Sequence, residues 1–285
     1  MKKAIYLAIS LSVLISLIWG CSSPKPSAIV LGNEQWAVSR ALAYMTKAVL
    51  EEKGFNVEIK DEGIQNIYRG VNQSKIDVFM DAWQSGHDVY LFENNQMEDL
   101  GPVFQGCRFG LAVPNYYPID SISHLLADSS VFGNVMYGVK KDAGVMIASQ
   151  TALNGYGLDP RIVEMEEDEL MKQLQLMIDQ KQNFVTAAWT PHWKMKFYDL
   201  KFLTDTTHVF DETDQIHAVA RPGFEKDQPR AAEIIRNISL TDEQITELLI
   251  LTKDASTPED LGRITRGWVK DNQDLVKSWT ANSGS

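Results

Sequence analysis

The sequence has little cysteine and little positive charge. It contains two cysteines, and its 27 lysine and arginine residues stand against 38 aspartates and glutamates, giving a formal net charge of −11. An acidic chain without a basic cluster is a poor partner for phosphates, so we expect no binding to nucleic acid. Because Cys21 lies in a targeting region, Cys107 has no internal disulfide partner, and the fold must depend on its hydrophobic core.

Common signatures of catalysis and of metal binding are also missing. The sequence has no Gly-x-Ser-x-Gly elbow, no phosphate-binding loop with Gly-Lys-Ser or Gly-Lys-Thr, and no Gly-x-Gly-x-x-Gly. Its five histidines show no His-x-x-x-His spacing, and there is no cysteine pair with ligand spacing. We therefore predict no bound metal, no cofactor and no enzymatic activity.

The first residues have the layout of a secretory signal. Over residues 1–20, two lysines precede an apolar run, and Ile18-Trp19-Gly20-Cys21 resembles a bacterial lipobox. This pattern predicts a signal peptide over 1–20, lipidation of Cys21, and a lipidated tether over 21–27. The alternative is an uncleaved transmembrane anchor, since the apolar run is just long enough to span a membrane. Either interpretation places the body of the protein outside the cytoplasm.

From Ile29 onward, short apolar strands alternate with amphipathic helices. This alternation predicts an α/β fold in which a mainly parallel sheet is flanked by helices. The remaining length suits two lobes of ordinary domain size. We expect the chain to cross between lobes near residues 109–114 and 213–221. The predicted lobes are residues 28–111 with 219–285, and residues 112–218.

Three of the seven tryptophans follow short apolar strands. They are Trp36, Trp83 and Trp189, and their strands are 29–32, 78–82 and 184–188. In an α/β sheet, ligands bind beyond the carboxyl ends of the strands. Three indoles at that edge would form an aromatic cage for a quaternary ammonium group through cation–π attraction. For any single tryptophan the alternative is ordinary core packing.

Residues 140–146, Lys-Lys-Asp-Ala-Gly-Val-Met, predict a glycine turn that opens a helix. The start of a helix suits an anion, because its first N–H groups point at the ligand. An aromatic cage together with an anion site predicts a small zwitterionic ligand.

Several polar residues near the tryptophans have open roles. His87 follows Trp83 and His192 follows the third tryptophan, but a lone histidine is more often a surface or core residue. Asp81 beside Trp83 is a candidate acid or base, or a residue that orients its loop. The acidic run over residues 164–169 predicts a solvated helix start, where carboxylates complement the helix dipole.

Several motifs, in this order and spacing, resemble the glycine betaine/proline betaine-binding proteins of ABC importers. The resemblance covers Ile29 to Trp279. The motifs are Asp77-Val78-Phe79-Met80-Asp81-Ala82-Trp83, Leu100-Gly101-Pro102, Gly110-Leu111-Ala112-Val113-Pro114, Tyr156-Gly157-Leu158-Asp159, Ala188-Trp189-Thr190-Pro191-His192-Trp193 and Tyr198-Asp199-Leu200-Lys201-Phe202-Leu203. It implies the two-lobed periplasmic-binding-protein fold (type II-like), with a hinge and with ligand in the cleft between the lobes.

The resemblance also implies a ligand site. It assigns the ligand's trimethylammonium group to Trp36, Trp83 and Trp189. It assigns the carboxylate to His87 and to the backbone amides of Gly144 and Val145. The loops at residues 84–86 and 142–144 depart from the family, whose members often carry proline there.

The implied function is that of a lipid-anchored receptor for glycine betaine or a related compatible solute. It would deliver this small molecule to an ABC permease in the membrane, whose ATPase lies in the cytoplasm. A receptor for choline or carnitine is the near alternative, and a sensor unrelated to transport is another. From a different class, a secreted choline-ester hydrolase would need a nucleophile such as Ser85 with His87 as its base.

Overall fold

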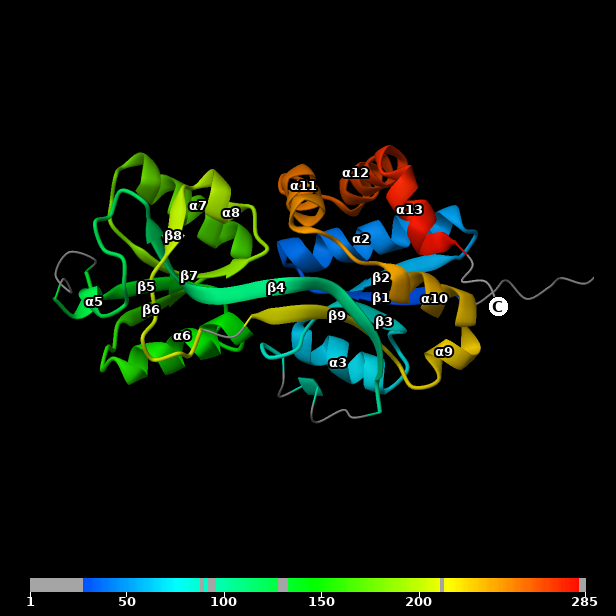
Figure 1. Ribbon diagram of the computed structural model, residues 1–285, viewed down its shortest axis with the longest axis horizontal. Coiled ribbons are helices and arrows are strands. Elements are labelled where there is room, and N and C mark those ends of the chain that lie inside the picture. Colours follow the sequence, from blue (N-terminus) through cyan, green and yellow to red (C-terminus); the bar gives the residue numbers. More distant parts are fainter. Residues whose placement is uncertain (1–27, 88–89, 92–95, 128–132, 211–212, 282–285) are drawn as a thin grey trace, which may run out of the picture.

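The computed structural model describes residues 28–87, 90–91, 96–127, 133–210 and 213–281. The predicted signal peptide and tether, including Cys21, lie outside these residues. Figure 1 shows two lobes joined by the long strands β4 (Glu98–Pro114) and β9 (Asp214–Ala220). Of the helices that the structure describes, none is both long and apolar enough to cross a membrane.

The first lobe combines the start of the chain with its end. Its N-terminal elements are β1 (Ile29–Asn33), α2 (Ala37–Glu52), β2 (Val57–Asp61), α3 (Ile64–Asn72) and β3 (Val78–Trp83). Its C-terminal elements are α9 (Phe224–Asp227), α10 (Pro229–Asn237), α11 (Asp242–Thr252), α12 (Pro258–Asp271) and α13 (Gln273–Thr280). From Pro229 onward, the described elements are all helices.

The second lobe is formed by the middle of the chain. Its elements are α5 (His124–Ala127), β5 (Val135–Gly138), α6 (Gly144–Gly155), β6 (Arg161–Glu164), α7 (Glu167–Asp179), β7 (Val185–Thr190), α8 (Lys194–Phe197) and β8 (Leu200–Phe202). Helix α6 begins at the glycine turn expected from the sequence.

The sheet combines parallel outer pairs with an antiparallel centre. Its strand order is β2-β1-β3-β9-β4-β7-β5-β6, and β8 pairs with β4. Strands β2, β1 and β3 pair in parallel, as do β7, β5 and β6, whereas β9 and β4 run antiparallel to their neighbours. The predicted two-lobed α/β fold is confirmed, and its antiparallel centre was not foreseen.

Strand β4 serves both lobes. Its first part pairs with β9 as far as Cys107, and from Arg108 it pairs with β7. Strand β4 therefore passes from the sheet of the first lobe into that of the second, and β9 beside it returns the chain to the first lobe. The residue boundaries predicted for the lobes stay a prediction.

The helices of the first lobe pack through apolar faces. Helix α2 buries an apolar stripe that includes Leu42 and Met45. Helix α12 is capped by Thr257, whose Oγ1 accepts the N–H of Asp260 at 3.1 Å. Trp268 and Trp279, which do not follow strands, are buried and stacked with ring centroids 6.4 Å apart.

Candidate ligand-binding site

The three predicted cage tryptophans lie at the carboxyl ends of strands. Trp36 follows β1 as the N-cap residue of α2, Trp83 ends β3, and Trp189 is the penultimate residue of β7. The rings of Trp36 and Trp189 lie 6.3 Å apart at 41°. These two residues come from different lobes, so the lobes meet at this aromatic pair.

Trp83 is held by two neighbours. Its ring stacks on Phe109 of β4, with centroids 4.8 Å apart, and its Nε1 donates to Asp81 Oδ1 at 2.9 Å. Burial raises the pKa of Asp81 well above its usual range, although the bond from Trp83 acts in the opposite direction. Asp81 therefore orients the indole. The ring contact of Phe109 had no signal in the sequence.

His87 is buried behind Trp83. Its Nδ1 accepts the backbone N–H of Trp83 at 3.2 Å and lies 3.0 Å from the hydroxyl of Tyr68. Burial lowers the pKa of His87 to about 3, so the ring is neutral at physiological pH. Because Nδ1 accepts a hydrogen bond, Nε2 carries the proton. Any bond from His87 to a ligand carboxylate would come from a neutral N–H.

The structure gives no support to a nucleophile at Ser85. The backbone N–H of Ser85 donates to Asp214 Oδ1 at 3.0 Å, and that of Gly86 donates to Asp214 Oδ2 at 3.0 Å. Asp214 thus shapes the loop after Trp83, and among the described residues Nδ1 of His87 is engaged by Trp83 and Tyr68, whereas the hydrolase alternative would need a histidine nitrogen directed at Ser85.

The predicted anion site lies where α6 begins. Gly144 and Val145 are buried, and Ala143 at the N-cap position forms no side-chain cap. The first N–H groups of a helix have no acceptor within it. Gly144 also lies against Gly86 of the first lobe, so closely that a Cβ on Gly144 would be 2.4 Å from the carbonyl oxygen of Gly86. The helix start is therefore pressed against the loop that follows Trp83.

Glu167 connects the lobes at the other side of the site. Its Oε2 accepts the backbone N–H of Ala37 at 2.9 Å, and its Oε1 lies 2.5 Å from Nε2 of His192. Nδ1 of His192 accepts the N–H of Lys194, so Nε2 carries the proton that is donated to Glu167. The expectation of a solvated acidic helix start is wrong for Glu167, which begins α7 but is only 6% exposed.

Opposing effects set the protonation of this pair. Burial acts to raise the pKa of Glu167, but the bond from His192 and the nearby charges outweigh it and keep the pKa below its usual value. Burial, together with the neighbouring Lys194, lowers the pKa of His192 to about 4. The arrangement is therefore a carboxylate bound to a neutral imidazole. This pair holds His192 in the loop after β7, and the His192 ring packs edge-on against Trp189 with centroids 5.0 Å apart.

Nothing in the local sequence singles out Lys194. Its side chain is fully buried, and its Nζ lies 3.2 Å from the centroid of the Trp189 ring. Within the part of the chain that the structure describes, Nζ has no hydrogen-bond partner. Burial lowers the pKa of Lys194 to about 7, with Glu167 acting in the opposite direction. An ammonium group thus lies on a ring of the predicted cage.

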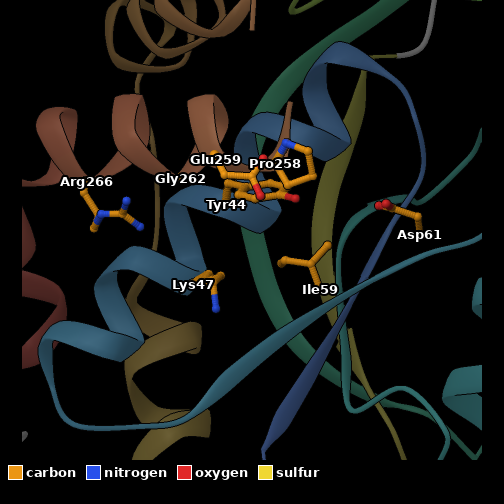
Figure 2. Close-up of a pocket in the computed structure, with 8 residues that line it drawn as sticks. All are labelled: Tyr44, Lys47, Ile59, Asp61, Pro258, Glu259, Gly262 and Arg266. Atoms are coloured by element: carbon orange, nitrogen blue, oxygen red, sulfur yellow. The ribbon is translucent and has the colours of Figure 1, made fainter. Parts of the chain in front are cut away.

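A separate cavity of about 450 Å³ lies in the first lobe between α2, β2 and α12 (Figure 2). Its lining residues are Tyr44, Lys47, Ile59, Asp61, Pro258, Glu259, Gly262 and Arg266. Two of its charged groups are already engaged, since Lys47 Nζ pairs with Glu51 at 2.6 Å and Asp61 accepts from Asn33 at 2.6 Å. It contains none of the predicted ligand-binding residues. Across the described ranges, no group of three His, Cys, Asp or Glu side chains is arranged to hold a metal ion.

Comparison with known proteins adds independent information. Residues 27–271 match the family described as the substrate binding domain of ABC-type glycine betaine transport system, OpuAC. The glycine betaine/carnitine transport binding protein GbuC of Listeria monocytogenes is 32% identical over 146 residues, which are 50% of this chain and 48% of that protein. The aligned stretch therefore spans about half of this curated relative.

Two solved structures share the fold over nearly the whole chain. The glycine/betaine/L-proline-binding protein ProX of Borrelia burgdorferi superposes with a TM-score of 0.84 at 28% identity, covering 90% of this chain and 97% of that one. Lactococcal OpuAC, in its closed conformation with glycine betaine, gives a TM-score of 0.82 at 24% identity, covering 89% and 99%.

Proposed function

Because this chain belongs to the family of substrate-binding domains of ABC-type glycine betaine transport systems, we propose that it captures glycine betaine or a closely related quaternary-ammonium solute. It would hand this solute to an ABC permease in the membrane, driven by a cytoplasmic ATPase. The observation that carries the proposal is the aromatic pair Trp36 and Trp189, which meet across the lobes at 6.3 Å.

The cation would be held by aromatic rings. A trimethylammonium group cannot donate conventional hydrogen bonds, so cation–π attraction is the main specific interaction open to it. Trp36 and Trp189 supply one side of such a site, and Trp83, fixed by Phe109 and Asp81, supplies another. Each desolvated contact of this kind contributes on the order of 1–2 kcal/mol.

The carboxylate would be held by N–H groups. The backbone amides of Gly144 and Val145 begin α6, where the helix dipole also favours an anion. The neutral ring of His87 can add its Nε2–H, since Nδ1 already accepts from Trp83. A betaine carboxylate satisfies these donors. Choline offers only a hydroxyl, and each unpaired buried donor costs about 1–3 kcal/mol.

Binding would be coupled to closure of the lobes. The contacts that join them include the hydrogen bond from the Ala37 N–H to Glu167 and the packing of Gly144 on Gly86, besides the pair of Trp36 and Trp189. A ligand that touches tryptophans of both lobes is held fully only when these contacts form. It therefore shifts the population toward the closed state, which is the state that a permease would recognise.

The experiment is a calorimetric titration against glycine betaine, proline betaine, carnitine and choline. We expect betaine to bind at least tenfold more tightly than choline. Trp36→Ala, Trp83→Ala and Trp189→Ala should each weaken betaine binding about tenfold or more. Trp→Phe at these three positions should be milder, and Trp268→Phe, in the distant core, is the control and should leave affinity unchanged. Unchanged affinity in two of the three alanine variants would refute the cage, and equal affinities for betaine and choline would refute the carboxylate assignment.

Attachment to the membrane would occur through lipid on Cys21, which holds the receptor on the outer side of the cell membrane or in the periplasm. The support is the sequence Ile18-Trp19-Gly20-Cys21 after an apolar run. We expect Cys21→Ser to move the protein from the membrane fraction to the soluble fraction with ligand affinity unchanged. Retention of this variant in membranes would favour a transmembrane anchor formed by the apolar run before Cys21.

A further inference from the structure

We propose that Lys194 is a specificity-determining residue, which disfavours ligands of net positive charge and thereby directs the site toward zwitterions. The inference rests on the proposed function, because it concerns the selectivity of the same aromatic site. It starts from the position of Nζ, 3.2 Å from the centroid of the Trp189 ring, in a side chain with no exposed surface.

The ammonium group of Lys194 has few partners around it. Among the described residues, Nζ has no hydrogen-bond acceptor. The carboxylate that interacts electrostatically with Lys194 is Glu167 on α7. Its two oxygens already accept hydrogen bonds from the Ala37 N–H and from Nε2 of His192. His192, in the loop before α8, is neutral, and burial raises the pKa of Asp81 on β3. The charge of Lys194 is therefore only partly compensated within the site.

The Trp189 ring would be shared by Lys194 and the ammonium group of the ligand. A cation attracted to Trp189 lies over one face of the indole, and Nζ already lies over a face. A ligand ammonium group on the opposite face would lie roughly 4 Å from the ring centroid, within the usual range for a cation on an aromatic ring. Added to the 3.2 Å between Nζ and the centroid, this places the two cations roughly 7 Å apart. In a partly buried site such a pair repels appreciably, because the effective dielectric constant is far below that of water.

The charge of Lys194 acts differently on a cationic ligand and on a zwitterionic one. Choline carries one positive charge, so the field of Lys194 acts against the whole ligand. Betaine carries a carboxylate within a few bonds of its ammonium group, and the same field attracts that carboxylate. The two effects largely cancel for betaine, which is neutral overall. Lys194 should therefore weaken choline binding by about tenfold or more while changing betaine binding little.

The experiment uses Lys194→Met, which keeps an unbranched side chain one atom shorter and removes its charge. The matched control is Lys196→Met, an exposed lysine on the same helix. Affinities for betaine and choline are measured by calorimetry at pH 6, where Lys194 is protonated. We expect Lys194→Met to bind choline about tenfold or more tightly and betaine within about threefold of wild type. Lys196→Met should change neither.

A pH series provides a second measurement that needs no variant. Burial lowers the pKa of Lys194 to about 7, so between pH 6 and pH 8.5 the wild type should lose much of its preference for betaine over choline. In Lys194→Met the preference should stay constant over the same range. This comparison separates Lys194 from Asp81, which is present in both proteins.

The outcomes separate the inference from the function on which it rests. A wild type that binds no quaternary ammonium ligand would refute the proposed function. A wild type that binds betaine, together with a Lys194→Met variant whose betaine-to-choline ratio is unchanged, would refute only the role of Lys194. A wild-type ratio that does not vary with pH would refute it as well, and does so even if Lys194→Met fails to fold.

Discussion

Adding one methyl group at Gly144 should prevent the lobes from closing fully. A Cβ at this position would lie 2.4 Å from the carbonyl oxygen of Gly86 and 2.9 Å from its Cα. Both neighbours are backbone atoms, so no side chain can rotate away to make room. The two segments must separate by roughly 1 Å to reach ordinary contact, and overpacking of this kind costs about 1–3 kcal/mol.

The cost falls on the closed state alone. Gly86 follows β3 in the first lobe and Gly144 begins α6 in the second, so the clash disappears when the lobes open. Gly144→Ala should therefore weaken ligand binding by about 5- to 150-fold, which is the same free energy expressed as affinity. Alanine keeps the backbone N–H, so betaine and choline should weaken by similar factors. The melting temperature without ligand should stay at the wild-type value or rise slightly.

The assay is calorimetric titration of both ligands together with thermal unfolding of the free protein. The control is Gly267→Ala, an exposed helical position where an added Cβ has no atom within 4 Å. That variant should gain about 0.5–1 kcal/mol of stability and keep its affinity. An affinity of Gly144→Ala within twofold of wild type would show that the two segments do not meet in the ligand-bound state.

Two further predictions concern buried titratable groups. Glu167→Gln removes the charged acceptor of the Ala37 N–H and should weaken ligand binding about tenfold, as loss of a charge-assisted bond does. Glu169→Gln, at an exposed position on the same helix, should have little effect. An unchanged affinity in Glu167→Gln would exclude a role in closure. Burial lowers the pKa of His87 to about 3 and is the main cause that lowers that of His192 to about 4, so the unfolded chain binds protons that the folded chain rejects. Stability should be complete above about pH 6.5 and fall as pH decreases toward 4, by at most about 1.4 kcal/mol per pH unit for each histidine. Thermal unfolding at pH 7.5, 6 and 5 measures this loss of stability, and His87→Gln should make the melting temperature depend less on pH. Equal melting temperatures of the wild type at all three pH values would contradict the prediction.

The features that depend on local pattern can be predicted from the amino-acid sequence. Short apolar strands followed by amphipathic helices fix the α/β class, because the periods of 2 and 3.6 residues decide which faces are buried. The strand-end positions of Trp36, Trp83 and Trp189, and the helix start at Gly144, follow from the same local rules. The motifs around them were enough to point to the family.

Which distant residues share the site depends on how the two lobes pack together. Glu167 lies in an acidic run typical of a solvated helix start, yet it is buried because it meets the backbone of Ala37, 130 residues earlier in the chain. Phe109 stacks on Trp83 because it lies where β4 passes from the first lobe into the second. In the sequence, Lys194 cannot be told from a lysine on the surface. The packing of α8 places its ammonium group on the Trp189 ring. The physical reason is common to all three: burial and charge pairing depend on contacts between segments far apart in the chain, and no local periodicity records those contacts.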